Sequence, residues 1–273
     1  MKQISARGKN KYKSILFKHS FESRKNSGLL WFLFKVYFLH YEFYFETLLR
    51  SRNMIRKLQV RRGERIFEAG CGLGFDSLRI ANKHAVVVGG DVDTRFRYSS
   101  CLGNSTLLRS IDFIKMDLRY VPIRSQVFDK IACTDVLEHV SDDDKVVSEF
   151  SRVLKDNGRL FVHVPNLKRF ARGKKNTSMK TRLFERSEYG HVRDGYTFNQ
   201  LSALFVKNGV RVYDHIYTFG FWSRIAGYVH HFYSKCNSGT LVFPICFFLA
   251  LLDRGSKTDE YNGGILIEGK KLN

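Results

Sequence analysis

The sequence has few cysteines, and their placement argues against two common ways of stabilising a protein. Five cysteines occur in 273 residues, an odd number, and no two of them form a CxxC pair. We therefore expect no disulfide framework, no metal site and a reducing compartment. The cysteines are Cys71, Cys101, Cys133, Cys236 and Cys246.

The sequence also lacks an apolar run long enough to span a bilayer as a helix, which takes about 20 residues. The segment 28–56 is apolar and aromatic, but charged residues and a histidine interrupt it, and the run 241–252 is too short. The chain begins with a polar, basic stretch instead of a signal-peptide core. We therefore expect a cytoplasmic protein. Both apolar segments leave two roles open, which are covering a binding pocket and lying against a membrane surface.

Acidic residues are scarce in two parts of the chain. The net charge is +20, of which residues 1–62 supply +12 and residues 168–186 supply +7, whereas residues 63–167 are close to neutral. Clusters of this kind attract polyanions, either nucleic acid or the anionic face of a membrane. A solvated surface with a mobile basic arm over residues 1–27 is the alternative.

A strand, a bare turn and a helix are predicted around residues 65–81. Ile66 and Phe67 read as the end of a buried strand, and the following turn has glycines at every second position, at 70, 72 and 74. The helix that begins after Phe75 turns its free N–H groups toward this turn. A dinucleotide fingerprint would need a third glycine where Phe75 stands, so this spacing excludes an NAD site.

This turn resembles the first motif of the class I S-adenosylmethionine-dependent methyltransferases, in which an acid precedes alternate glycines. The resemblance implies that S-adenosyl-L-methionine is the cofactor. The motif runs Glu68-Ala69-Gly70-Cys71-Gly72-Leu73-Gly74, and we expect Glu68, Gly70, Cys71, Gly72 and Gly74 to bind the cofactor. A tight turn without a ligand is the alternative.

Two later strand ends carry acids in the order that this family shows. Asp91 follows three valines and lies 23 residues after Glu68, where an acid can accept both hydroxyls of a ribose. By resemblance, Val92 is a further cofactor contact, and Asp117 and Leu118 hold the adenine. A helix cap is the alternative for Asp91.

The segment 128–140 resembles the fourth motif of the subgroup related to quinone-biosynthesis and other small-molecule methyltransferases. Its end, Thr134-Asp135-Val136-Leu137-Glu138-His139-Val140, places a turn beside the methionine end of the cofactor, which makes Asp135 a cofactor contact. Enzymes that methylate the exocyclic amines of bases usually carry Asn/Asp-Pro-Pro-aromatic here. This stretch has no proline, which argues against amino methylation of DNA or RNA.

The resemblance implies an α/β fold, a doubly wound and mostly parallel seven-stranded sheet with helices on both faces. We expect residues 1–60 to form a basic arm and an aromatic helical extension, and residues 61–273 to form the methyltransferase domain. The domain would carry a basic loop, 166–196, and an apolar helical insertion, 218–262.

The acceptor side is predicted from histidines near the methionine end. His191 lies in the long basic loop, within a Gly-His-x-Arg motif that recurs in the resembling subgroup, and is our first candidate for substrate contact or proton acceptance. His139 is the second candidate. Structural roles remain open for both, a hydrogen bond for His191 and bracing of the turn for His139.

Three functions are compatible with these features. The first is methyl transfer to a small molecule, a lipid or a glycan intermediate, with peripheral contact to an anionic membrane. The alternative is an RNA methyltransferase that holds phosphates with its basic arm and loop. Nucleic acid is the less favoured partner because Phe170 and Phe184 are the only aromatic residues interleaved with the basic cluster of the loop. The third is cofactor binding without catalysis. The sequence predicts no oligomeric state.

Overall fold

The computed structural model describes residues 45–93, 108–172, 190–235, 245–246, 248–249, 251–253 and 255–273. The predicted basic arm, most of the predicted aromatic helix and residues 173–189 of the basic loop lie outside these ranges. Phe45–Asn273 forms one of two compact units of the chain and is the part considered below.

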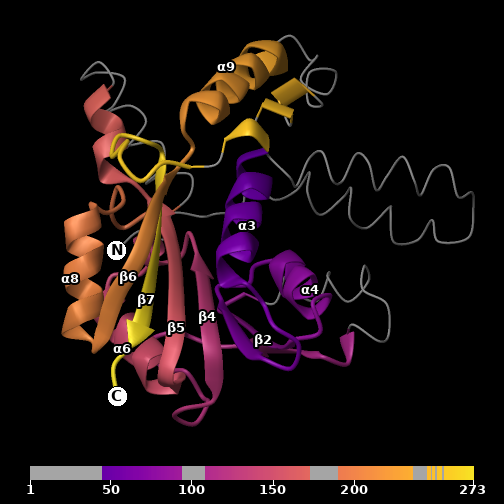
Figure 1. Ribbon diagram of the computed structural model, residues 1–273, viewed down its shortest axis with the longest axis vertical. Helices are drawn as coiled ribbons and strands as arrows, with labels where there is room; N and C mark the ends of the chain where they lie inside the picture. Colours follow the sequence, from indigo (N-terminus) through magenta and orange to yellow (C-terminus); the bar gives the residue numbers. More distant parts are fainter. Residues whose placement is uncertain are drawn as a thin grey trace, which may run out of the picture. The chain divides into compact units, whose positions relative to one another are not determined.

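Seven strands form a single sheet in the order β3-β2-β1-β4-β5-β7-β6. Neighbouring strands are parallel, except that β7 runs antiparallel to both β5 and β6. The sequence predictions of seven strands and of a mostly parallel sheet are therefore confirmed (Figure 1). The strands are β1 (Arg65–Ala69), β2 (Val86–Asp91), β3 (Ile111–Lys115), β4 (Phe128–Thr134), β5 (Leu154–Pro165), β6 (Val210–Thr218) and β7 (Gly264–Lys271).

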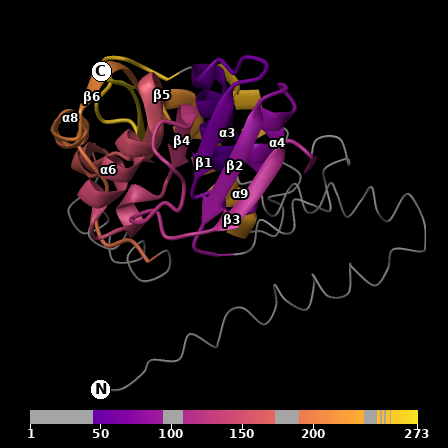
Figure 2. The ribbon, with the colours of Figure 1, turned by 90° about the horizontal axis from the view of Figure 1, so that it is seen from below.

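Helices cover both faces of this sheet, as expected of a doubly wound fold. Figure 2 shows α3 (Phe45–Leu58) and α4 (Phe75–Ala81) on one face, and α6 (Asp143–Val153) and α8 (Phe198–Lys207) on the other. Two 3₁₀ turns, η2 (Leu137–His139) and η3 (Leu167–Arg172), follow the ends of β4 and β5. The α3 helix, which lies in the predicted extension, packs against β4 and β5.

Each face of the sheet has its own hydrophobic core because successive strand residues point to opposite sides. On the first strand, Phe67 joins the core under α6 and α8, together with Phe150 and Phe205. Its neighbour Ile66 joins the core under α3 and α4, with Met54 among its members. Burial on both faces explains why the strands read as continuous apolar runs.

Side chains cap the starts of two helices. The α8 helix begins after Thr197, whose side chain and that of Gln200 form a reciprocal capping box. The α6 helix is capped by Asp142 and not by the neighbouring Ser141. The Asp142 side chain accepts the N–H of Lys145 at the start of this helix. Its negative charge also interacts favourably with the positive end of the helix dipole.

A helical cap follows β6 without a long connection. We use "the cap" for α9 (Phe221–Lys235) together with the helical residues 245–246, 248–249 and 251–252. Asp253 joins its two parts by accepting the N–H of Ser223, at 3.1 Å, and that of Gly255. In the described ranges, no helix combines the length and the hydropathy needed to cross a membrane.

Candidate functional site

The glycine turn after β1 has left-handed backbone at all three glycines, with φ of +77° at Gly70, +52° at Gly72 and +78° at Gly74. Their surroundings differ. A Cβ at Gly72 would meet no atom within 4 Å, whereas a Cβ at Gly70 would lie 2.1 Å from Val136 Cγ2. Gly72 therefore opens backbone to a ligand, and Gly70 makes room for the turn after β4.

The predicted ribose acid lies directly beside this open backbone. An Asp91 carboxylate oxygen accepts the N–H of Gly72 at 2.8 Å, and the other accepts the N–H of Asp93 at 2.9 Å. Val92, between the two acids, is 65% exposed. The structure therefore brings together Gly72, Asp91 and Val92, three residues predicted to bind the cofactor, at the carboxyl ends of β1 and β2.

Glu68 and Cys71 lie beneath the turn and are buried. The Glu68 carboxylate accepts the Ser77 hydroxyl of α4. Burial, followed by the nearby Asp76 carboxylate, raises the pKa of Glu68 to about 8. Burial and the charge of Glu68 also raise the pKa of Cys71 above its usual range. Both residues are placed to shape the turn from below.

The predicted adenine contacts lie beyond β3. The Asp117 carboxylate accepts hydrogen bonds from Arg119 Nε at 3.1 Å and from its Nη2 at 2.6 Å. These hydrogen bonds hold the pKa of Asp117 below its usual range. Leu118 is only 5% exposed and packs in the core. An amine that binds Asp117 would have to share this carboxylate with Arg119.

A chain of polar contacts joins the ends of β4, β5 and β6. Asp135, after β4, has a left-handed φ of +52° and forms an ion pair with Arg50 of α3. Its carboxylate also lies 2.6 Å from His163 Nδ1 of β5. His163 Nε2 in turn lies 2.9 Å from the hydroxyl of Thr218 at the end of β6. The predicted residue Asp135 is therefore held from two sides.

The His163 ring is neutral in this chain of contacts. Burial, followed by the charges of Arg50 and Arg169, lowers the pKa of His163 to about 3. A neutral ring can donate its Nδ1–H to Asp135 and accept the Thr218 hydroxyl at Nε2. Gly264 of β7 packs against this pair, since a Cβ there would lie 2.5 Å from Thr218 Oγ1 and 2.6 Å from His163 Nε2.

The two histidines predicted for the acceptor side lie together. The rings of His139 and His191 are 4.6 Å apart between centroids and meet edge to face. The backbone explains this proximity, because the N–H of Val192 donates to the carbonyl of Glu138 at 2.9 Å. Burial and the neighbouring His139 lower the pKa of His191 to about 4. A neutral His191 can accept a proton at physiological pH.

Glu138 completes a cluster with metal-ligand geometry. One ligand atom each from Glu138, His139 and His191 lies within 4.8 Å of the others. The Glu138 side chain is 1% exposed, so the trio combines a buried carboxylate with two imidazole rings. Imidazole and carboxylate groups are ligands for divalent transition metals. The sequence predicts no metal, and among the described residues this trio is the set best arranged to hold one.

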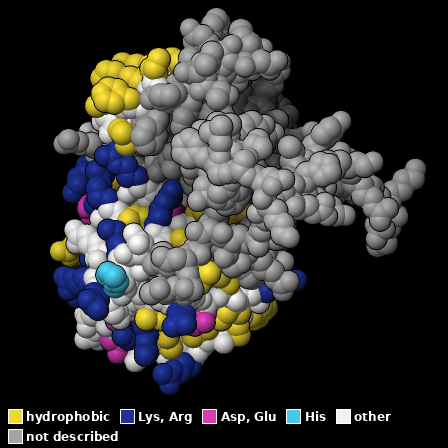
Figure 3. All heavy atoms as spheres, turned by 90° about the vertical axis from the view of Figure 1, so that its right-hand side faces the viewer, with side chains coloured by type: hydrophobic (Ala, Val, Ile, Leu, Met, Phe, Trp, Pro, Cys, Tyr) yellow, Lys and Arg dark blue, Asp and Glu magenta, His cyan; other side chains and the backbone are white. Residues whose placement is uncertain are grey.

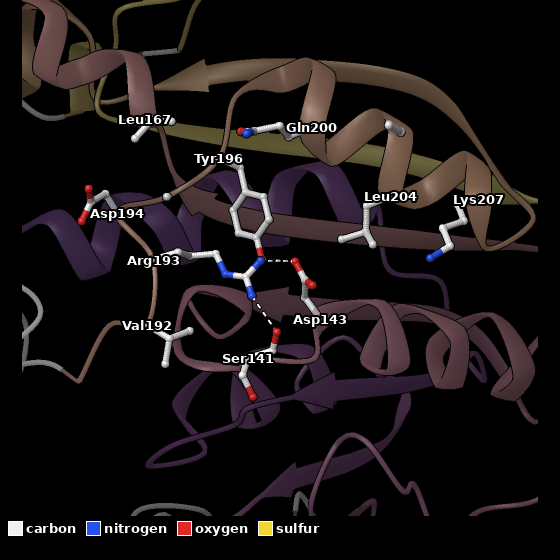
Figure 4. A pocket seen from close by; sticks show the side chains of 12 residues that line it. Ser141, Asp143, Leu167, Val192, Arg193, Asp194, Tyr196, Gln200, Leu204 and Lys207 are labelled. Carbon is white, nitrogen blue, oxygen red and sulfur yellow. Dashed lines mark hydrogen bonds and ion pairs between the residues drawn. The ribbon is translucent and has the colours of Figure 1, made fainter.

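Arg193, which the sequence places only inside the Gly-His-x-Arg motif, proves to be a clamp. Its guanidinium donates to the carbonyls of Val140, at 2.8 Å, and Ser141, at 3.0 Å, and forms an ion pair with Asp143 of α6. The Tyr196 hydroxyl donates to the same Asp143 carboxylate at 2.7 Å. Figure 4 shows these side chains in a cleft of about 760 Å³. The clamp fixes the loop that carries His191 onto the turn that carries His139.

Comparisons with known proteins agree with this geometry. A methyltransferase domain family matches residues 67–162. The ubiquinone biosynthesis O-methyltransferase of Coxiella burnetii is 27% identical over 105 residues, which cover 38% of this chain and 45% of that protein. This chain contains a class I S-adenosylmethionine-dependent methyltransferase domain.

Solved structures support the fold of this methyltransferase domain. An S-adenosylmethionine-dependent methyltransferase from Mesorhizobium loti has a TM-score of 0.60 at 15% identity, covering 84% of this chain and 100% of that chain. Phosphoethanolamine N-methyltransferase 2 of Haemonchus contortus, in complex with S-adenosyl-L-methionine, has a TM-score of 0.59 at 14% identity, covering 82% of this chain and 52% of that chain. The chain spans less than half the length of the curated relative that it matches.

Proposed function

We propose that this protein transfers the methyl group of S-adenosyl-L-methionine to a small-molecule, lipid or glycan-intermediate acceptor. The observation that carries the proposal is the Asp91 carboxylate beside the open backbone of Gly72, 2.8 Å from its N–H. A ribose that approaches the turn meets both a carboxylate that can accept its hydroxyls and backbone without side chains. The residues present therefore fit the cofactor.

Each strand tip would hold a different part of the cofactor. Asp91 would bind the ribose, Asp117 and the exposed Val92 would contact the adenine, and the turn after β4 would lie beside the methionine end. Asp135 is suited to that last place because Arg50 and His163 fix its carboxylate from two sides. When bound, the cofactor supplies a methyl group on a sulfonium, which is already activated for displacement.

The chain's own residues then position the acceptor and remove its proton. Orienting a nucleophile in line with the methyl carbon can contribute about 7–11 kcal/mol to lowering the barrier. An oxygen or nitrogen acceptor gives up a proton as its bond to the methyl carbon forms. His191 would take that proton at the moment of transfer, since its ring is neutral near pH 7, and Glu138 and His139 lie beside it.

The RNA alternative has no equivalent support. The basic arm and residues 173–186 of the basic loop, which motivate it, lie outside the described residues, so it stays a prediction. The match to a ubiquinone biosynthesis O-methyltransferase favours a small-molecule acceptor.

The cofactor assignment is tested by binding of S-adenosylhomocysteine in calorimetry. Asp91→Ala should weaken binding by about tenfold or more because two hydrogen bonds to a charged group are lost. Asp93→Ala, which removes an exposed carboxylate two residues away, should leave the affinity unchanged. Equal affinities for all three proteins would mean that the ribose lies elsewhere.

Methyl transfer itself is tested with S-adenosyl-L-methionine labelled in its methyl group. The protein is incubated with fractions of a cell extract, and the labelled product is identified by mass. We expect a labelled small molecule or lipid, with label lost in Asp91→Ala and kept in Asp93→Ala. Label found in RNA would support the alternative acceptor, and no label in any fraction would support binding without catalysis.

A further inference from the structure

The outer face of the cap is apolar and exposed. Within α9 the exposed or half-exposed residues Phe221, Ile225 and Tyr228 follow each other at i, i+4 and i+7, so they share one side of the helix. In the second part of the cap, Ile245, Phe248 and Leu252 recur at i, i+3 and i+7 and are also exposed. Of the Phe and Trp side chains that the structure describes, all that are exposed lie in the cap.

The inner side of the cap is buried against α3. Ala226 of α9 and Cys246 of the second part are fully buried and pack with Leu49 of α3. Val229 and Leu249 pack around the same cluster. Each part of the cap therefore has a buried side and an apolar outer side, whereas a helix at a water-exposed surface usually has a polar outer side.

Basic side chains border this apolar face. Arg52 of α3 is exposed and donates to the carbonyl of Leu251 at 3.0 Å, beside the exposed Leu252. Arg56 of α3 and Arg224 of α9 add further positive charge, and the described side chains of α3 and α9 include no carboxylate. Figure 3 shows hydrophobic side chains gathered at the upper left of the view and Lys and Arg side chains just below them.

We propose that the cap, Phe221–Tyr228 with Ile245–Leu252, docks on an anionic lipid bilayer. Aromatic side chains prefer the interface between lipid and water, and flanking Lys and Arg are attracted to anionic headgroups. A second copy of the chain fits this face less well. Two caps related by a twofold axis would bring the same basic border together from both copies, and the described side chains of α3 and α9 offer no carboxylate to compensate it.

Docking in this way would turn the reactive edge of the sheet toward the membrane. The β6 strand ends at Thr218, which contacts His163, and α9 begins at Phe221. Between them, the ring of Phe219 meets His163 edge to face with centroids 5.8 Å apart. Resting on the proposed function, we infer that the acceptor is amphiphilic, with its reactive head at the strand tips and its tail in the lipid.

The test is binding of the full chain to vesicles of phosphatidylcholine, with and without phosphatidylglycerol. The sequence holds two tryptophans, so a Trp31→Phe background leaves Trp222 as the fluorescent reporter of the cap. We expect cosedimentation with the anionic vesicles and a blue shift of Trp222 emission on binding, which reports transfer of the indole from water to lipid.

Substitutions in the cap test whether its apolar face contributes to vesicle binding. The double variant Phe221→Asp/Phe248→Asp should lower the vesicle partition coefficient about tenfold or more, because it places charge where apolar surface enters the lipid. Val206→Asp is the matched control, since Val206 on α8 is 62% exposed, as is Phe248. Tyr228→Asp serves as a second cap variant should the double variant fold poorly, as judged by circular dichroism.

Each result decides the proposal. Unchanged partitioning of both cap variants, or no vesicle binding by the unaltered chain, would overturn it. A dimer in light scattering that Phe248→Asp disperses would also overturn it and assign the face to a second copy. Calorimetry with S-adenosylhomocysteine on the same proteins keeps the two proposals apart. Docking can fail while cofactor binding persists, and cofactor binding can fail while docking persists.

Discussion

His163 shows how a single buried residue can organise the reactive edge. It contacts Asp135 through Nδ1 and Thr218 through Nε2, which joins the ends of three strands. In the neutral ring Nε2 accepts the Thr218 hydroxyl, whereas in a protonated ring both nitrogens donate and the hydroxyl would have to turn and accept. The residue therefore makes the site sensitive to acid.

The pH dependence of stability should show this sensitivity. The pKa of His163 is about 3 in the folded protein, below the ordinary value of 6.5, so the unfolded chain binds more protons between these values. Stability present above pH 6.5 is then lost as the pH falls toward 3, by up to about 1.4 kcal/mol per pH unit. Urea unfolding of His163→Gln should show a flatter dependence than the unaltered protein. The control, His84→Asn, alters an exposed histidine and should keep the original slope. If the free energy of unfolding of His163→Gln depended on pH as strongly as that of the unaltered protein, other groups would be responsible for the loss of stability in acid.

At the scale of elements, the last part of the predicted basic loop, residues 190–196, helps to position His191 through hydrogen bonds. Residues 190–196 cross over the turn after β4, and hydrogen bonds from Val192 and Arg193 hold them there. The position of His191 thus depends on the side chain of Arg193, which lines the cleft of Figure 4.

Removing the clamp should reduce catalysis without reducing cofactor binding. Arg193→Ala should lower the methyl-transfer rate by about 10- to 100-fold, the loss expected when a reacting group moves by about 1 Å. Arg193→Lys should retain part of the rate. A lysine keeps a positive charge beside Asp143 but lacks the planar guanidinium that donates to two carbonyls. Lys207→Ala is the control, as its ion pair with Asp144 is exposed. Affinity for S-adenosylhomocysteine should be equal in all four proteins, and an equal rate in Arg193→Ala would remove the clamp from the mechanism.

The sequence allowed the elements to be predicted better than the contacts between them. Three consecutive valines suffice to predict β2, and glycine spacing predicts the turn at 70–74, because these signals are local. The partnership of Arg50 with Asp135 joins residues 85 positions apart, and no local pattern announces it. The Gly-His-x-Arg motif contains Arg193, but the motif does not predict that its side chain donates to the carbonyls of Val140 and Ser141. Backbone carbonyls have no sequence signature.

At the scale of the whole molecule, the domain combines a thoroughly packed sheet with a lightly packed cap. The two cores of the sheet include large, fully buried rings such as Phe67, Phe150 and Phe161. The cluster beneath the cap has only Leu49, Ala226 and Cys246 as fully buried members among the described residues. Local opening should therefore occur in the cap at a lower free energy than in the sheet.

Hydrogen exchange should resolve this difference. Amides of β4 and β5 should exchange only through global unfolding, whereas those of α9 should exchange through a local opening of lower free energy. Anionic vesicles should slow exchange in α9 and leave that in β5 unaltered, so β5 serves as the internal control. Protection of α9 equal to that of β5 without vesicles would contradict a separately opening cap.

The fit of Gly264 against Thr218 and His163 also limits how this protein can be re-engineered. Even a methyl group at position 264 would clash with His163 of β5 and Thr218 of β6 and push these two strand ends apart. The residue itself lies on β7 and outside every recognised motif. Libraries aimed at a new acceptor should keep this glycine fixed. Conversely, Gly264→Ala offers a way to loosen the reactive edge without altering any group that handles a proton.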